Sequence, residues 1–395
     1  MKKSKLLLLK IFLFILAAIS ASMPFMCRGG FAQELDTTEI AFGDTTIQTA
    51  AKAMVVIEAN SGRILSSHNA EEKLPMASLT KIITAIVAIE NTKDLDGKHQ
   101  ITPAAIGLEG SSIYLKAGEH LSMRELLYGL MLRSGNDSAV AIANIVSGST
   151  EEFAKKCNEF CKQIGATNTN LVNPHGLHDD NHYTTASDLA KISAYAINNP
   201  TFKEIVNTQQ IDIPNELGKF DHRELINKNK FLKMLSGANG IKTGYTKKAG
   251  RCFVGSTYRE SDGMQVVCVL LNCQPMFQEC RALTEKALEQ YSMIELLPLS
   301  GYESSVNVSK SEQLTTMAKS NSGFKYPLTK TEEDKISITN TLQSVYTAPI
   351  KTDESLGEVK VFLDKQLIFS DNIYSINNVE NNSYSENLAK IIQEF

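Results

Sequence analysis

The chain has 395 residues, of which 43% are hydrophobic and 21% charged, and its formal net charge at pH 7 is −4. This length predicts two or three domains with a sizeable core, and the acidic balance argues against a nucleic-acid partner. No cluster of histidines and cysteines has the spacing of a zinc site, so we expect neither a metal nor another cofactor.

The first 32 residues differ in composition from the rest. Residues 1–5 are basic, residues 6–26 are mainly apolar, and Gly30-Phe-Ala32 offers small residues for cleavage. This layout predicts a secretory signal peptide over 1–32 and export to the periplasm or cell envelope. The alternative is an uncleaved membrane anchor, because the apolar stretch is long enough to span a bilayer. Export permits disulfides, but a mature chain of this size does not need them, and we expect the remaining cysteines to be buried free thiols.

The elements expected after the leader follow an α+β order. Alternation around a Gly-containing turn predicts a hairpin over 53–66, and a nearly all-apolar run predicts a buried helix over 75–90. Ser122 and Glu125 form a capping box that begins another helix. The hairpin and the later strands could pair into one sheet, whereas residues 211–238 are predicted to be polar and irregular. Further helices are expected at 138–146, 151–165, 185–197 and 278–293, and strands at 240–244, 252–257 and 264–271.

The pattern changes after residue 301, where short alternating strands begin and continue to about residue 379. Val359 and Val361 lie on one side of such a strand, and Asp364-Lys365 follows as a turn. We therefore predict a main domain over 44–297 and a small all-β domain over 301–379.

Ser78 and Lys81 stand at the start of the predicted buried helix. They are about one helical turn apart, so the hydroxyl and the amine share a face. A helix N-terminus favours negative charge near the serine oxygen, and burial lowers the pKa of a lysine so that it can accept a proton. The pair predicts a serine nucleophile with a lysine base. A second Ser-x-x-Lys, at Ser322 and Lys325, contains a glycine and lacks an apolar helix behind it, so we discount it.

Two further motifs follow in order, Ser134-Gly-Asn136 at an expected corner between helices and Lys242-Thr-Gly244 in an expected strand. Taken alone, Asn136 could cap a helix and Lys242 could be a solvated edge-strand lysine. Together the three motifs match the set typical of penicillin-binding proteins and β-lactamases, with Gly135 in place of an aspartate.

Beyond these motifs, the chain resembles the low-molecular-weight penicillin-binding proteins of the serine D-Ala-D-Ala carboxypeptidase family over nearly all of its mature length. Met76 and Asn239 depart from this family, which usually has Pro and Asp in these places, but neither departure removes a reacting group. The stretches that carry the resemblance are 74–81, 126–137, 173–177 (Asn-Pro-His-Gly-Leu), 183–186 (Tyr-Thr-Thr-Ala), 240–246 (Gly-Ile-Lys-Thr-Gly-Tyr-Thr) and, in the C-terminal domain, 348–350 with Gly357.

The resemblance implies a penicillin-binding-protein/β-lactamase-like catalytic domain, made of a sheet and a helical subdomain, followed by the small all-β domain. It also implies a serine-type D-Ala-D-Ala carboxypeptidase. Such an enzyme removes the terminal D-alanine from peptidoglycan stem pentapeptides through an acyl-enzyme, here on Ser78. β-Lactam antibiotics such as penicillin would acylate the same serine and inhibit the enzyme.

The resemblance and the chemistry assign the same roles to the catalytic residues. Lys81 accepts the proton of Ser78, and Ser134 relays a proton toward the leaving amine. The amide of Asn136 holds the substrate backbone and the Lys81 ammonium.

The strand motif supplies the residues expected to bind the substrate. Lys242 and Thr243 suit the terminal carboxylate of the peptide, and Gly244 leaves room for the peptide to lie along the strand. The backbone N–H groups of Ser78 and Tyr245 would form the oxyanion hole.

Other functions and another base stay open at this point. A DD-endopeptidase would use the same site, although relatives with that activity usually lack the β domain. A β-lactamase is less favoured, because no Glu-x-x-Leu-Asn stretch follows Asn136 at the distance expected for a deacylating base. A non-enzymatic cell-wall binding protein is disfavoured because every reacting residue is present. His175 could act as a base for serine, but it lies in the Asn-Pro-His-Gly loop and is interpreted as structural.

The segment 381–395 carries a single apolar stripe at helical spacing. The resemblance implies an amphipathic helix here that holds the enzyme at the outer face of the cytoplasmic membrane. The segment is short and offers little positive charge to anionic lipid, so a helix docked on the β domain, or a frayed tail, is an equal alternative. The stripe consists of Tyr384, Leu388, Ile391, Ile392 and Phe395.

Overall fold

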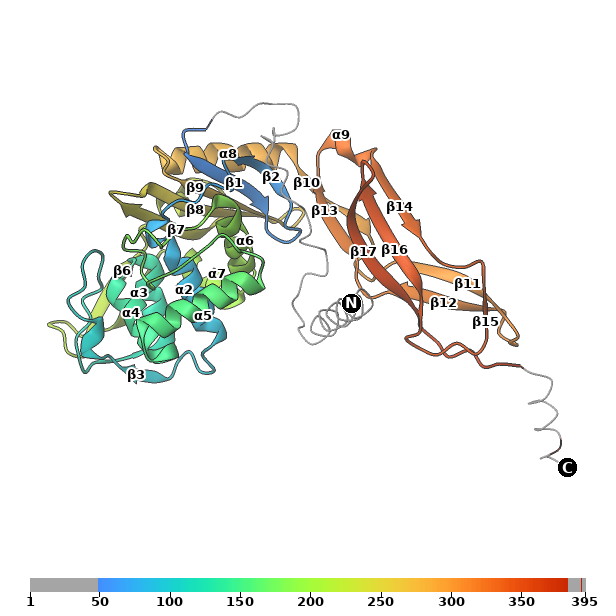
Figure 1. Ribbon diagram of the computed structural model, residues 1–395, viewed down its shortest axis with the longest axis horizontal. Helices are drawn as coiled ribbons and strands as arrows, with labels where there is room; N and C mark the ends of the chain where they lie inside the picture. Colours follow the sequence, from blue (N-terminus) through green and yellow to red (C-terminus); the bar gives the residue numbers. More distant parts are fainter. Residues whose placement is uncertain (1–48, 383–391, 393–395) are drawn as a thin grey trace, which may run out of the picture. The chain divides into compact units, whose positions relative to one another are not determined.

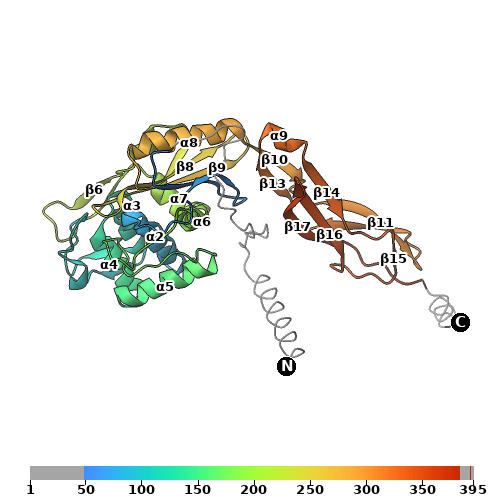
Figure 2. The same cartoon turned by 45° about the horizontal axis from the view of Figure 1, so that its top comes forward.

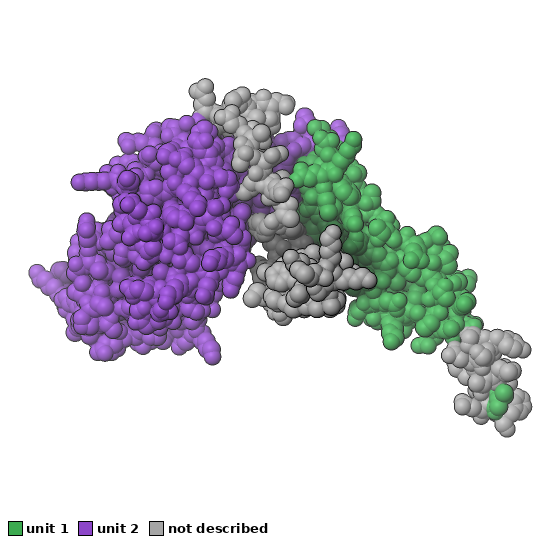
Figure 3. Space-filling view, viewed as in Figure 1, with its two compact units in different colours: residues 1–32, 296–324, 335–395 green, residues 33–295, 325–334 purple. Residues whose placement is uncertain are grey.

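A computed structural model of the chain describes residues 49–382 and residue 392. The expected signal peptide and most of the expected C-terminal helix lie outside these residues. In the described part, no helix is long and apolar enough to cross a membrane. The described residues form two compact units, which Figure 3 colours separately. One contains the chain up to Glu295 together with Lys325–Asp334, and the other contains Leu296–Phe324 and the chain from Lys335 onward.

The first unit is built on a five-stranded antiparallel sheet in the order β2-β1-β9-β8-β7 (Figure 1). This arrangement confirms that the N-terminal hairpin and the later strands share one sheet. Because β7 is the last strand of the sheet, it has a free edge. The strands are β1 (Ala53–Glu58), β2 (Ile64–His68), β7 (Ala238–Thr246), β8 (Gly250–Arg259) and β9 (Met264–Leu271).

Both faces of this sheet are covered by helices. Successive residues of β1 alternate between two cores: Met54 and Val56 belong to one, and Val55 and Ile57 belong to the other. Helix α8 (Met276–Gln290) covers the first face, and the helices of the α2 to α7 region lie on the second face (Figures 1 and 2). The sheet therefore lies between two apolar layers, which explains why every residue of β9 is buried.

The helices on the second face begin where capping residues predict. Ser122 and Glu125 form the expected capping box, and the hydroxyl of Thr185 caps the helix that follows it. Helix α2 is buried from Thr80 to Ala88, as its apolar sequence predicted. The helices are α2 (Thr80–Glu90), α3 (Met123–Leu132), α4 (Asn136–Ser147), α5 (Thr150–Gln163), α6 (Ala186–Ile197) and α7 (Pro200–Asn207).

The prediction of irregular structure over 211–238 was wrong. Strands β5 (Gln210–Pro214) and β6 (His222–Ile226) form an antiparallel hairpin, and a 3₁₀ turn follows at Lys230–Lys233. Both strands are short and mostly exposed, and the alternation is brief because one of the two buried positions of β6 is occupied by Arg223. The hairpin is held by a contact of Arg223 with Glu119, which is distant in sequence. A second small pair, β3 (Lys98–Gln100) with β4 (His120–Ser122), lies before α3.

The other unit is dominated by a six-stranded sheet in the order β14-β16-β17-β12-β11-β15, which confirms the all-β C-terminal domain. Asp364 and Lys365 form the predicted turn, and both have positive φ, as a two-residue hairpin turn requires. The strands are β11 (Glu303–Ser309), β12 (Thr315–Ser320), β14 (Ile336–Asn340), β15 (Val345–Thr347), β16 (Ser355–Leu363) and β17 (Gln366–Ser375).

A two-stranded pair joins β10 (Ser292–Leu297) to β13 (Phe324–Leu328), and the short helix α9 (Lys330–Glu333) follows. Helical periodicity predicted that the closing helix ends at Met293. Helix α8 ends earlier, at Gln290, because β10 begins at Ser292. The expected free thiols are all present: Cys157, Cys161, Cys252, Cys268, Cys273 and Cys280 are buried and unbridged.

A buried ion pair fixes the unpredicted β5–β6 hairpin. Nη2 of Arg223 lies 2.9 and 2.7 Å from the two carboxylate oxygens of Glu119, and Nη1 donates to the carbonyl of Pro214 at 2.7 Å. The side chains are only 8% and 0% exposed. Removing one member of such a pair leaves an uncompensated charge in the interior.

We expect Arg223→Met to lower the free energy of unfolding by about 3–5 kcal/mol, because Glu119 would lose its partner. The matched control is Arg281→Met, which breaks an ion pair whose two side chains are 49% and 45% exposed. It should change stability by less than about 1 kcal/mol. Urea unfolding of both variants measures the difference, and equal losses would contradict the role of the buried pair.

Candidate active site

Ser78 lies in a 3₁₀ turn, Ala77–Leu79, that leads directly into α2. The α-helix begins two residues after Ser78, so the serine lies just before the N-terminus of α2 and not within the helix. Ala77 has a φ of +49°, which places its peptide in the left-handed region. Met76 is fully buried beside the turn, so the side chain that replaces the usual proline packs in the core.

Lys81 is completely buried, and its amine lies within hydrogen-bond distance of three oxygen atoms. Its Nζ lies 3.1 Å from Oγ of Ser78, 2.7 Å from Oδ1 of Asn136 and 2.7 Å from the carbonyl oxygen of His175. Burial, followed by the positive charge of Lys242, holds the pKa of Lys81 well below its usual value. The amine is therefore within proton-transfer distance of the serine hydroxyl, in an environment that disfavours its charged form.

Ser134, Gly135 and Asn136 form the corner between α3 and α4, as predicted. Ser134 adopts a φ of +63°, which turns the chain sharply. A Cβ at Gly135 would lie 2.7 Å from Oδ1 of Asp137 and from Oγ of Ser138, so a side chain there would have to displace these two groups. This crowding explains the glycine in the middle of the motif.

A loop that precedes α3 is fixed to this corner. The backbone N–H of Asn136 donates to Ser111, and its Nδ2 donates to the carbonyl of Glu109 at 2.5 Å. The buried carboxylate of Asp137 accepts hydrogen bonds from the Ser112 hydroxyl and from the backbone N–H groups of Ile113 and Leu115. These contacts hold segment 109–115 beside Asn136.

The strand motif lies on the free edge of the sheet, in β7. Lys242 is 2% exposed, and its Nζ donates to the carbonyl of Thr243 at 2.9 Å. Burial and the nearby charge of Lys228 lower the pKa of Lys242 to about 7. A Cβ at Gly244 would lie 3.2 Å from the backbone nitrogen of Ser78, so the glycine allows β7 to approach the turn that carries Ser78. Tyr245, the next residue, is 63% exposed.

Lys228 was not predicted from the sequence to belong to the site. Its Nζ donates to the Ser111 hydroxyl at 3.1 Å, and its charge lowers the pKa values of both Lys81 and Lys242. Lys228 lies between two asparagines just after β6, in a stretch without a motif, and only the folded hairpin brings it to the site. Its position gives the site three lysines and a positive potential suited to an anionic ligand.

The predicted site residues are not all joined by hydrogen bonds. Ser78, Lys81 and Asn136 form one connected group. Across the described residues, no hydrogen bond links the Ser134 hydroxyl to this group. His175 contributes its backbone oxygen to Lys81, while its Nδ1 accepts from the N–H of Leu177 at 3.1 Å. Burial and the charge of Lys81 lower the pKa of His175 to about 4.

Asn239, the second departure from the family pattern, is explained by its neighbours. Its Nδ2 donates to Oε1 of Gln265 at 2.9 Å, and its Oδ1 accepts from the Ser256 hydroxyl at 2.6 Å. An aspartate could not make the first of these hydrogen bonds, so the amide matches Gln265 in this chain.

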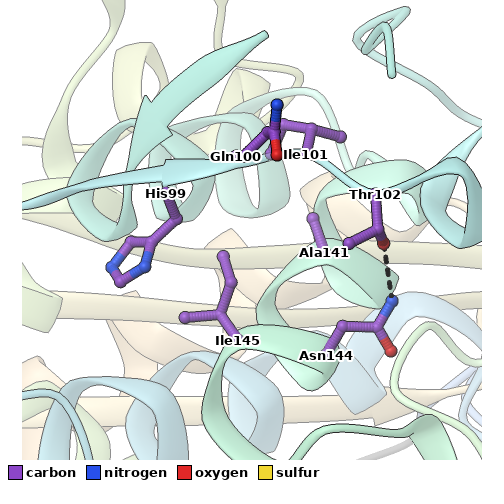
Figure 4. Close-up of a pocket in the computed structure, with 7 residues that line it drawn as sticks. All are labelled: His99, Gln100, Ile101, Thr102, Ala141, Asn144 and Ile145. Atoms are coloured by element: carbon purple, nitrogen blue, oxygen red, sulfur yellow. Dashed lines mark hydrogen bonds between the residues drawn. The ribbon is translucent and has the colours of Figure 1, made fainter. Parts of the chain in front are cut away.

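A separate pocket of about 230 Å³ lies between β3 and α4 (Figure 4). Its lining includes none of the predicted site residues. Thr102 and Asn144 are joined across it by a 3.4 Å hydrogen bond, and the other lining residues are His99, Gln100, Ile101, Ala141 and Ile145.

Comparison with known proteins identifies the family. Residues 40–275 match the family model described as D-alanyl-D-alanine carboxypeptidase. The chain belongs to this family. Residues 291–381 match the C-terminal domain of penicillin-binding protein 5. The chain is thus a low-molecular-weight penicillin-binding protein with both parts that the resemblance implied.

Relatives and solved structures agree with this assignment. The carboxypeptidase DacF of Bacillus subtilis is 29% identical over 327 residues, which cover 80% of this chain and 83% of DacF. DacC of Escherichia coli is 31% identical, over 66% of this chain and 64% of DacC. The crystal structure of penicillin-binding protein 5 from Haemophilus influenzae is 26% identical with a TM-score of 0.72, and it covers 85% of this chain and 99% of that chain.

The predicted enzyme class is therefore confirmed: this carboxypeptidase is a serine-type D-Ala-D-Ala hydrolase with a penicillin-binding-protein fold. A peptidoglycan substrate, β-lactam binding and a location in the cell envelope fit the family.

Proposed function

We propose that Ser78 is the acylated nucleophile of this carboxypeptidase and that Lys81 is its general base. The 3.1 Å distance between Nζ of Lys81 and Oγ of Ser78 carries the proposal, because it lies within hydrogen-bond reach. The lowered pKa of Lys81 supplies a neutral amine that can take the proton. The hydroxyl then attacks the carbonyl between the two D-alanines.

The tetrahedral intermediate needs donors for its oxyanion. The N–H of Ser78 lies in the middle of the turn, and β7 approaches it so closely that a Cβ at Gly244 would lie 3.2 Å from this nitrogen. The N–H of Tyr245, on the same strand, is the second donor. One such donor contributes about 3 kcal/mol to transition-state stabilisation in well-studied enzymes. Ser134 passes the proton to the departing D-alanine, and water later hydrolyses the acyl-enzyme.

The side-chain amide of Asn136 has one N–H group left for the substrate. Its Oδ1 is bound to Lys81, and one N–H of its Nδ2 is bound to Glu109. The second N–H remains to hold a carbonyl of the substrate backbone. Asn136 thus links the position of the base to the position of the substrate.

Lys242 and Thr243 bind the terminal carboxylate, which distinguishes a carboxypeptidase substrate from an internal peptide. The free edge of β7 lets the peptide pair as an added strand. Lys242 is buried beside this edge, and the charge of Lys228 adds to the attraction for an anion. A bound carboxylate would in turn stabilise the charged form of Lys242.

We expect Ser78→Ala to abolish covalent labelling by a fluorescent penicillin and to lower D-alanine release from a pentapeptide by at least about 10³-fold, because the ester cannot form. Ser322→Ala is the matched control, since Ser322 begins the other Ser-x-x-Lys of the chain. It should leave labelling and release unchanged. Labelling of the Ser78→Ala variant, or loss of labelling in the Ser322→Ala variant, would show that the nucleophile is not Ser78.

The two lysines predict a bell-shaped dependence of kcat/KM on pH. Activity rises with pH as Lys81 becomes neutral, and it falls above pH of about 7 as Lys242 loses the charge that binds the carboxylate. Lys242→Arg should shift the falling limb to higher pH, because a guanidinium stays charged, and should leave the rising limb in place.

The control for this experiment is the same peptide amidated at its C-terminus. Without a carboxylate, the wild-type enzyme should show no falling limb near pH 7, although its activity will be lower throughout. If the falling limb stays at the same pH in Lys242→Arg, the limb reports the titration of another group and not of Lys242.

We also propose that residues 1–32 direct export and that residues 381–395 attach the enzyme to the membrane surface. The apolar stripe from Tyr384 to Phe395 and the layout of the leader support this proposal. Deleting 385–395 should move the protein from the membrane pellet to the soluble fraction without changing D-alanine release from a soluble peptide. A full-length mature protein that is already soluble in fractionation would disprove the anchor.

A further inference from the structure

The turn that carries Ser78 is held by a buried hydroxyl. Thr80 is 0% exposed, and its Oγ1 donates to the carbonyl oxygen of Ala77 at 2.8 Å. Ala77 is the residue with positive φ just before the serine. A left-handed conformation is uncommon for a residue with a side chain and persists where surrounding contacts fix it. The hydroxyl of Thr80 is one such contact.

A buried histidine determines the direction in which this hydroxyl points. His182 is 2% exposed, and its Nε2 lies 2.7 Å from Oγ1 of Thr80. Its Nδ1 accepts a hydrogen bond from the backbone N–H of Val172 at 3.1 Å. A backbone N–H can only donate, so Nδ1 carries the lone pair and Nε2 carries the proton. Nε2 therefore donates to Thr80, and Thr80 must give its own proton to Ala77.

The loop that contains Gly176 packs against the same turn. Gly176 has a φ of +87°, and a Cβ there would lie 2.0 Å from the carbonyl oxygen of Ala77 and 2.8 Å from Oγ1 of Thr80. The neighbouring carbonyls of Pro174 and His175 accept hydrogen bonds at 2.7 Å from Thr84 and Lys81, respectively. The loop thus fixes the base through one carbonyl and packs against the nucleophile turn with its glycine.

We propose that His182 is a positioning residue for the reaction: through Thr80 it holds the peptide of Ala77 in the left-handed conformation that points Ser78 at Lys81. His182 touches neither substrate nor reacting atoms. Burial lowers its pKa to about 4, so the ring stays neutral and keeps this proton arrangement near neutral pH. The inference rests on the proposed role of Ser78 as nucleophile.

Two pairs of matched variants test the inference. Thr80→Val keeps the shape of the side chain and removes the hydroxyl, whereas Thr80→Ser keeps the hydroxyl. His182→Phe keeps a ring and removes both nitrogens, whereas His182→Gln can still donate from a nitrogen near the position of Nε2. Stopped-flow acylation by a penicillin separates the acylation rate constant from the dissociation constant of the non-covalent complex, and thermal melting reports folding.

We expect Thr80→Val and His182→Phe to lower the acylation rate constant about 10- to 100-fold, because a small displacement of a reacting group has an effect of this size. The dissociation constant should change less than about threefold, since the binding residues are not altered. Thr80→Ser and His182→Gln should recover most of the rate.

Normal acylation by folded Thr80→Val or by folded His182→Phe would overturn the inference, and so would a failure of Thr80→Ser to restore the rate. If His182→Phe does not fold, a folded His182→Gln that acylates as slowly as Thr80→Val would overturn it, because this variant keeps the donor. Ser78→Ala, measured in parallel, separates the two proposals. Loss of labelling in Ser78→Ala together with normal acylation by Thr80→Val refutes only the positioning role, whereas labelling of Ser78→Ala refutes the proposed nucleophile.

Discussion

The proposed mechanism depends on one constraint, the burial of the Lys81 amine without a carboxylate in hydrogen-bond contact. Among the described residues its hydrogen-bond partners are a hydroxyl, a side-chain amide oxygen and a backbone carbonyl, all of them neutral. A carboxylate in contact would stabilise the ammonium and raise the pKa, so that the amine could not serve as a base. The apolar sequence of α2 therefore has a chemical purpose as well as a packing one, because it supplies the desolvation.

The same desolvation acts on Lys242, which has the opposite task in the proposed mechanism. There Lys81 must lose its proton to act as a base, whereas Lys242 must keep its proton to attract a carboxylate. The pKa of Lys81 is held well below its usual value, and that of Lys242 lies at about 7. Bound substrate would increase the difference between the two pKa values, because a carboxylate favours the charged form of the lysine that it contacts.

The position of these groups is set by segments that are distant in sequence. Asp137 fixes the loop at 109–115, the ion pair of Arg223 and Glu119 fixes the β5–β6 hairpin, and that hairpin leads to Lys228. Buried polar networks of this kind are rigid when each member has its hydrogen bonds. Rigidity matters for the proposed mechanism because a nucleophile and its base must stay within hydrogen-bond reach.

The amino-acid sequence by itself determined the features that depend on neighbours along the chain. The apolar run of α2, the capping box of Ser122 and Glu125, the turn at Asp364-Lys365 and the three motifs all follow from local pattern. It did not reveal the β5–β6 hairpin, the place of Lys228 or the contact of His182 with Thr80. These depend on side chains that meet only after folding, such as His182 with a residue 102 positions earlier. Tertiary structure alone decided them, because hydrogen bonds and ion pairs across such separations leave no period in the sequence.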